Sequence, residues 1–372
     1  MIKTGHLGRL ELLSLCVLAS VADAALIYPQ QLVLFGLSAG WMIPLVSMLI
    51  CLATWAVIGP MLVKAGPKGD LISLSKRYLG PLQLPVLLII ALYLLIDVTA
   101  LTRGFAEAVI TTVLPRSPIS FISIPFLLAV LYYAYQGVEG LSRVSWLVMP
   151  GTLLSFLGLL LLNANWFSYE YLFPLWGSGP VKIGIGGVLF TSVFLHLLIL
   201  MVLGTRLRDR RDMVKIGYWS IVLTALMYAL ITFVFILAFS PDGAMRSPFP
   251  MYQLGRLIYI GRFFQRLEAL FVFVWVTLAL IKTSVSLWMI CYLTASAFRM
   301  PVYRPLVFPI GLIIYALMFY PPGFAELIEW NNKYILTWGW VIVILLPVLL
   351  TYYFRMRQRK EEQRDESTAK TA

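Results

Sequence analysis

Hydrophobic residues gather into long runs along this chain, and short polar stretches separate the runs. A helix that crosses the hydrocarbon core of a bilayer needs about 20 apolar residues. Ten runs reach or approach this length, near residues 10–29, 37–63, 83–113, 120–136, 142–163, 181–203, 216–239, 263–297, 303–320 and 335–354. Strands in lipid would leave backbone polar groups unpaired, so the runs predict helices. We therefore predict an all-α integral membrane protein with ten transmembrane helices.

The composition agrees with this prediction. Hydrophobic residues make up 60% of the chain and charged residues only 12%, whereas soluble domains contain about 25% charged residues. Beyond the last run only a short basic tail, 355–372, remains. We expect one transmembrane domain over residues 1–372 and no separate soluble domain.

The net charge of +12 does not indicate nucleic-acid binding. Most of the 29 Lys and Arg residues fall in segments on the same side of the membrane as the N-terminus. This positive-inside pattern predicts that the N- and C-termini, including the 355–372 tail, are cytoplasmic. The basic loop "RLRDRRDMVK" is then interpreted as a solvated surface near anionic lipid headgroups. On the other side, the connection 240–262 is expected to carry a short surface helix.

The ten runs divide into two halves of five, at about residues 10–163 and 181–354. The third run is the longest in each half, and small or polar residues interrupt the first run of each, at "SVADAA" and "GIGGVLFTS". Since five is odd, the second half enters the membrane from the opposite side. Inverted repeats with broken helices at matching positions are typical of secondary transporters, which bind substrate at the breaks. We predict a five-plus-five inverted repeat of the LeuT-like type with helices 1 and 6 broken; ten helices without internal symmetry are the alternative.

Residues 20–29, "SVADAALIYP", allow two interpretations. Ala22-Asp23-Ala24 resembles a signal-peptidase site behind a basic start and an apolar run. It also resembles a break in a transmembrane helix, where unpaired backbone groups receive a ligand and small residues let it approach. The apolar run continues past the supposed cleavage site, which favours the break. We predict ligand contacts at Ala22, Asp23, Ala24 and Ala25.

Three charged residues lie deep inside the apolar runs: Asp23, Asp97 and Lys282. A charge at the centre of a spanning helix costs about 2.5–3.5 kcal/mol on insertion, so such residues usually face a cavity or a partner. Asp23 either serves as a counter-charge or proton site for a ligand, or it pairs with an intramembrane cation. For Asp97 the same two interpretations stay open. Tyr93 and Gly104 share its helical face at spacings of four and seven.

Further polar residues extend the candidate site. Thr191, Ser192, Phe194 and His196 follow the second break, and we include them as ligand-binding candidates. His196 is either a core histidine or a proton relay. Arg103 and Glu107 have the spacing of a local ion pair. Glu268, Trp275 and Lys282 recur every seven residues, as in a packing seam or a pocket-facing stripe.

The sequence gives little support for an enzyme. It contains two histidines and no H-E-x-x-H, G-x-S-x-G or nucleotide-binding loop. We predict no catalytic residues, no metal site and no cofactor. The three cysteines fall inside or at the ends of the runs, where packing is their expected role.

Three stretches together resemble the spore germination permease family, the B subunits of nutrient germinant receptors in the amino acid–polyamine–organocation superfamily. They are the first run ending in "ALIYP", then "FPLWGSGPVKIGIGGVLFTSVFLHLLILMVLG", and "FPMYQLGRLIYIGRFFQRLEALFVFVWVTLALIKTSVSLW". In the last of these, Arg266, Glu268 and Trp275 match the family's eighth-helix region.

The resemblance implies the ten-helix inverted-repeat fold and a pocket for a nutrient between helices 1, 3, 6 and 8. It also implies A and C receptor subunits as partners in the inner membrane of a spore. Two departures matter here. Asp23 stands where relatives receive a ligand carboxylate, and Leu198 stands where some relatives carry a glutamate. The alternative function is a proton-coupled amino-acid or polyamine symporter that uses Asp23, Asp97 or His196 as the titrating group.

Overall fold

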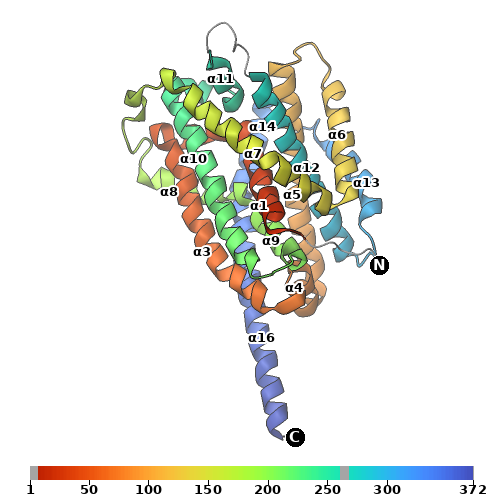
Figure 1. Cartoon of the computed structure of the whole chain (residues 1–372). Coiled ribbons are helices and arrows are strands. Elements are labelled where there is room, and N and C mark those ends of the chain that lie inside the picture. The colour runs from red at the N-terminus through yellow and green to blue at the C-terminus, as the bar shows by residue number, and fades with distance from the viewer. Residues whose placement is uncertain (1–6, 260–267, 372) are drawn as a thin grey trace.

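The computed structural model describes residues 7–259 and 268–371 (Figure 1). Within these ranges every regular element is a helix, and a single backbone bridge joins Leu7 to Leu207. The α-helices are α1 (Arg9–Val21), α2 (Tyr28–Gly36), α3 (Ile43–Lys64), α4 (Leu71–Tyr78), α5 (Gln83–Thr112), α6 (Ile119–Gln136), α7 (Val138–Leu162), α8 (Pro180–Leu189), α9 (His196–Leu203), α10 (Asp212–Arg246), α11 (Pro250–Leu257), α12 (Glu268–Ala297), α13 (Val307–Leu317), α14 (Phe324–Trp330), α15 (Thr337–Trp340) and α16 (Leu346–Thr371).

The lengths of the helices agree with a membrane protein. Seven helices of the described chain are long and apolar enough to cross a membrane, or eight if one bent pair counts as one span. The first predicted span is divided between α1 and α2, and the ninth corresponds to α13, which has 11 residues. The count of ten spans therefore stays a prediction, whereas the all-helical membrane fold is confirmed.

The first helix is interrupted where the sequence predicts it. α1 ends at Val21, the 3-10 turn Ala22–Ala25 follows, and α2 begins at Tyr28. Pro29 stands in the first turn of α2, where its missing N–H removes no helical hydrogen bond. The chain between the two helices is therefore free of regular α-helical pairing.

A second interruption separates α8 from α9. The 3-10 turn Phe190–Phe194 joins them, and the two segments are bent by 42°. α8 packs closely on α3, and Ser47 donates a hydrogen bond of 2.7 Å to the carbonyl of Gly187. The predicted break in the sixth span is therefore present in the structure.

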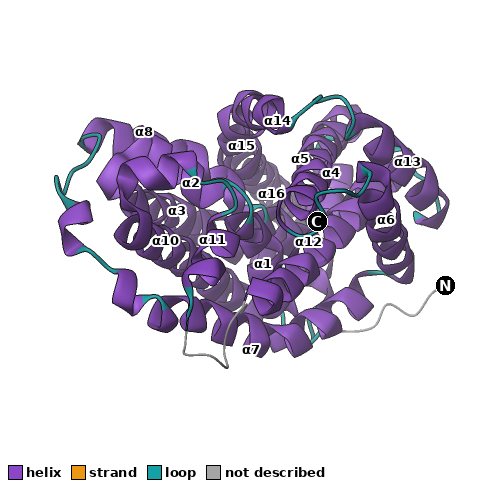
Figure 2. Ribbon diagram, turned by 90° about the horizontal axis from the view of Figure 1, so that it is seen from above, coloured by secondary structure: helices purple, strands orange, loops and turns teal. Residues whose placement is uncertain are grey.

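α1 lies in the middle of the molecule, between α10 and α12 and over α7 (Figure 2). α8 lies near one end of this arrangement, and α6 and α13 lie at the other. Large apolar side chains cover the outside, such as Leu147 at 75% and Phe121 at 67% exposure. Such a surface suits lipid contact.

The two ends of the bundle differ. At one end lies α11, the short helix expected in the 240–262 connection (Figure 1). Residues 260–262 of this connection lie outside the described part. At the other end α16 continues past the bundle as a single helix, and it carries the basic tail. Arg77 of α4 binds Glu361 at 2.6 Å and attaches the first turns of this extension to the bundle.

Candidate functional site

A cluster of three charged side chains joins the first break to two long helices. Lys282 of α12 places its Nζ atom 2.5 Å from Asp23 Oδ2 and 3.1 Å from Asp97 Oδ2. Asp23 belongs to the Ala22–Ala25 turn and Asp97 to α5. At 2% to 5% exposure, all three residues are buried. Each membrane charge thus has a partner on another element, and the sequence predicts this need without identifying the partner.

The charges of this cluster do not balance. With all three groups ionised, two carboxylates face one ammonium, and one negative charge is left over. Buried charges are costly unless paired and hydrogen-bonded. The next ion pair along α5 does not contribute, because Arg103 is bound to Glu107 at 2.6 Å. The cluster therefore favours a proton or a positively charged group beside it.

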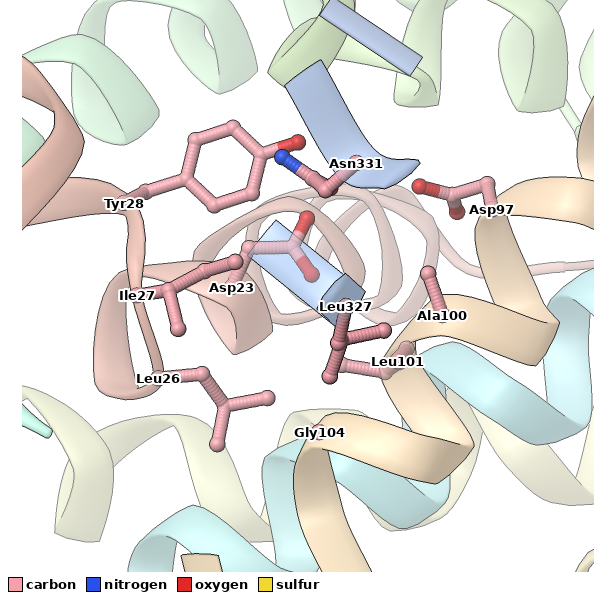
Figure 3. Close-up of a pocket in the computed structure, with 10 residues that line it drawn as sticks. All are labelled: Asp23, Leu26, Ile27, Tyr28, Asp97, Ala100, Leu101, Gly104, Leu327 and Asn331. Carbon is pink, nitrogen blue, oxygen red and sulfur yellow. The ribbon is translucent and has the colours of Figure 1, made fainter. Parts of the chain in front are cut away.

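A cavity lies directly beside the cluster, at the first break (Figure 3). Asp23 and Asp97 enter it from different helices, and the remaining wall is mostly apolar. Its other lining residues are Leu26, Ile27, Tyr28, Ala100, Leu101, Gly104, Leu327 and Asn331. The volume of about 20 Å³ suffices for one or two water molecules. The structure is thus a closed form, and a nutrient-sized ligand requires the walls to move apart.

The segment just before the last predicted span supplies one side of this cavity. Leu327 comes from α14, and Asn331 begins a π-helical segment, Asn331–Leu336. π-Helical turns frequently occur at functional sites. The Asn331 side chain faces the hydroxyl of Tyr28. Its amide nitrogen has no hydrogen-bond partner in the part of the chain that the structure describes.

The predicted ligand-binding residues separate into groups. Asp23 and Asp97 line the cavity, and Gly104, on the predicted shared face of α5, lines it too. Ala22 and Ala24 are buried in the turn behind Asp23 and do not line it. Ala25 lines a different small cavity together with Trp275. Small residues at the break therefore serve close packing in this closed form, and their contact with a ligand stays a prediction.

A second small cavity lies next to Lys282. It is lined by the Lys282 side chain together with Ser20 and His196. His196 Nδ1 is 2.7 Å from the Ser20 hydroxyl, and Nε2 has no partner among the described residues. Only one of the two ring nitrogens of His196 therefore has a hydrogen-bond partner among the described residues. His196 does not line the cavity that Asp23 and Asp97 line.

The other candidates at the second break are buried. Thr191 donates to the carbonyl of Val188 at 2.6 Å, and the Phe194 ring contacts the His196 ring. Ser192 packs against Gly339 in α15, where a side chain larger than hydrogen would collide with it. These residues line neither of the two cavities beside Lys282.

The residues with an expected structural role make different contacts. Arg103 makes the predicted pair with Glu107 and reaches the carbonyl of Pro322 at 3.1 Å. Trp275 is buried and its ring lies 5.5 Å from that of Phe105. Arg266 and the side chain of Glu268 lie outside the described residues.

Sequence reasoning missed Tyr28, Leu327 and Asn331. Tyr28 follows the break directly, and this position was a usable signal. Asn331 precedes the run that predicts the last span, where polar residues are ordinary. In the described ranges, no group of three His, Cys, Asp or Glu side chains could hold a metal ion.

Fold and site together define a polytopic membrane protein of transporter-like architecture, with a charged, closed cavity at a helix break. The family model described as "Spore germination protein" matches residues 6–322. The chain belongs to this family of spore germination proteins.

Two relatives agree with the family. Spore germination protein KB of Bacillus subtilis (strain 168) is 25% identical over 219 residues, which cover 58% of this chain and 59% of the relative. Spore germination protein XB of Bacillus anthracis is 24% identical over 219 residues, or 58% of this chain and 61% of the relative. The match thus spans about three-fifths of each relative's length.

Solved structures show the same fold. A mutant of the manganese transporter of Eremococcus coleocola has a TM-score of 0.59 at 15% identity, over 91% of this chain and 78% of that chain. The same transporter in complex with an aromatic bis-isothiourea substituted compound gives a TM-score of 0.54 at 15% identity, over 92% and 76%. At this identity the similarity shows a transporter fold and nothing about a ligand.

Proposed function

We propose that this chain is the permease-like membrane subunit of a spore germinant receptor and that it senses a small, amino-acid-type nutrient. The ligand binds at the breaks of helices 1 and 6, with Asp23 and Asp97 in contact with it. Membership of the family supports the receptor role. The observation that carries the site is the closed cavity beside the Asp23–Lys282–Asp97 cluster.

The closed state of the cavity supports a sensing role. A cavity of about 20 Å³ excludes an amino acid, so a ligand binds only a form in which the walls have separated. The walls belong to the first break, α5 and the last span, and α12 is attached to them through Lys282. A ligand that prefers the open form shifts the population toward it. A partner subunit that binds the open and closed forms with different affinities is then coupled to the ligand through this shift in population.

We propose a ten-span arrangement for this motion, in two inverted repeats of five. α1 with α2 forms the broken first span, and α8 with α9 forms the broken sixth span. The bend of 42° in the second pair and the transporter fold of similar structures support this arrangement. The partners are A and C receptor subunits in the spore inner membrane, and both termini face the cytoplasm.

The test is germination of spores that lack this chain. The spores are exposed to the common amino acids, glucose and inosine, and optical density is followed. We expect the loss of the response to at least one nutrient and its recovery when the wild-type gene is restored. Unchanged responses to the whole panel would contradict the receptor role.

A proton-coupled symporter is the second candidate function. The second cavity favours it, because Lys282 lines that cavity together with His196 and is ion-paired to the two carboxylates that line the first. Opening first one cavity and then the other would pass a ligand through the protein. Purified protein in liposomes distinguishes the functions: saturable uptake of a labelled nutrient that an imposed proton gradient drives supports the symporter, and binding without accumulation supports the receptor.

A further inference from the structure

A further polar group of the cavity comes from the stretch that precedes the last predicted span. Asn331 lines the cavity, and it is the first residue of the π-helical segment that follows α14. The family match ends at residue 322, so this residue lies outside the stretch that the family model accounts for. Asn331 is therefore a polar cavity residue on a part of the chain that the family resemblance does not explain.

The Asn331 side chain has unused hydrogen-bonding capacity. The residue is 3% exposed, and its Nδ2 atom, which faces the Tyr28 hydroxyl, makes no hydrogen bond of normal geometry among the described residues. Native proteins leave few buried donors unpaired, and each such group needs an explanation. The neighbouring Asn332 differs, because its Nδ2 donates to Gln31 Oε1 at 3.2 Å and it does not line the cavity.

The carboxylates of the cavity are already engaged. Lys282 binds both of them, and the Tyr28 hydroxyl lies beside the Asn331 amide. Asn331 lies beside Asp23 and Asp97 in the cavity wall, and its amide, which carries two N–H hydrogens, offers an uncharged donor to a ligand there (Figure 3). The excess negative charge of the cluster disfavours a second anion in so small a space. An uncharged oxygen, as in a carboxamide, an alcohol or a sugar, suits this donor better than a carboxylate.

We propose that Asn331 determines ligand specificity by donating a hydrogen bond from Nδ2 to an uncharged oxygen of the nutrient. This inference rests on the proposed function and narrows the ligand class. The acceptor belongs to a small molecule that enters the cavity when its walls separate. The charge cluster then faces the remaining polar groups of the ligand.

The test compares spores that carry the wild-type chain, Asn331→Ala, Asn331→Gln or the matched control Asn332→Ala. Immunoblots establish equal protein levels, and dose–response curves are measured with L-asparagine, L-aspartate, L-alaninamide, L-alanine and glucose. We expect a response to one or more compounds with an uncharged acceptor. For these, Asn331→Ala raises the half-maximal concentration about tenfold, as for the loss of one buried hydrogen bond. The half-maximal concentration for Asn331→Gln, which keeps the amide, should lie between the values for the wild type and Asn331→Ala. The value for Asn332→Ala should equal that of the wild type.

Two results would overturn the inference. One is a wild-type dose–response and ranking of nutrients in Asn331→Ala at normal protein level. The other is a preference for L-aspartate over L-asparagine in the wild type that Asn331→Ala leaves intact. If Asn331→Ala lowers the protein level, Asn331→Gln is used instead. A changed ranking of nutrients in Asn331→Gln supports the inference, whereas an equal loss of all responses indicates a purely structural role and contradicts it. If deletion of the whole chain changes no response, the proposed function fails instead, independently of Asn331.

Discussion

Lys282 Nζ and Asp23 Oδ2 lie 2.5 Å apart, although 259 positions separate the two residues in the chain. This ion pair joins the turn that interrupts the first helix to the middle of α12, and the contact with Asp97 adds α5. A transporter-like bundle can change shape only if such elements move relative to each other. The cluster is therefore in a position to couple events in the cavity to the arrangement of three helices.

Replacement of Lys282 by Met should strongly destabilise the protein. It leaves two carboxylates buried without a cation, and removing one partner of a buried ion pair costs about 3–5 kcal/mol. Thermal unfolding of the detergent-purified protein measures the loss. The double variant Lys282→Met/Asp23→Asn should recover part of it, since one unpaired charge is gone. A Lys282→Met protein as stable as the wild type would show that the cluster contributes nothing to the fold.

The two carboxylates should be individually dispensable for folding. Asp23→Asn or Asp97→Asn alone leaves Lys282 with one counter-charge, so we expect membrane levels within about twofold of the wild type. The double variant leaves the ammonium unpaired, and its level should fall well below either single variant. Quantitative immunoblots of membranes make the comparison. Equal levels in all three variants would argue against the cluster as a source of stability.

Two glycines should respond to alanine in opposite ways. A Cβ atom on Gly104 would lie 3.6 Å from Leu327 Cδ2, an ordinary contact, and it would fill part of the cavity. A Cβ atom on Gly187 would collide with the Val46 side chain of α3. We expect Gly104→Ala to keep or raise the melting temperature and to weaken the nutrient response. Gly187→Ala should lose about 1–3 kcal/mol of stability through overpacking, and the reverse order of melting temperatures would contradict the described packing.

The three cysteines should be unreactive in the folded protein. Cys16, Cys51 and Cys291 are all fully buried, and buried thiols of this kind are chemically inert. A maleimide added to native membranes should leave them unlabelled, whereas the same reagent in denaturant should label all three. Rapid labelling of any of them before unfolding would show that the bundle opens at that helix.

The sequence was sufficient to predict much of the fold because the physics of lipid is restrictive. Apolar runs of spanning length must be helices. The small and polar residues at 20–25 and 184–192 predict interruptions, which the structure has at 22–25 and 190–194; the glycines of the second stretch lie within α8. The count of spans does not follow from the runs alone, since α13 is shorter than the run that predicts it. Hydropathy measures composition over a window and does not give the residue at which a helix ends.

The candidate site was predictable only in part. The insertion cost of a charge identifies Asp23, Asp97 and Lys282 one by one, but it does not reveal that they meet, because pairing depends on how distant helices pack. Asn331 has no such signal, since it lies at the edge of an apolar run, where polar residues are ordinary. The alanines of the first break show the opposite error: small residues predict a ligand contact, yet Ala22 and Ala24 are buried behind the cavity wall in this closed form.

The most direct measurement of the central claim is the dose–response of germination in spores that carry Asp23→Asn in place of the wild-type chain. The variant is compared with the wild type at equal protein level, against the nutrient to which the deletion strain fails to respond. If the cavity beside the cluster binds the nutrient, the variant loses the response or transfers it to a different nutrient. A dose–response identical to that of the wild type across the whole panel would show that the ligand binds elsewhere.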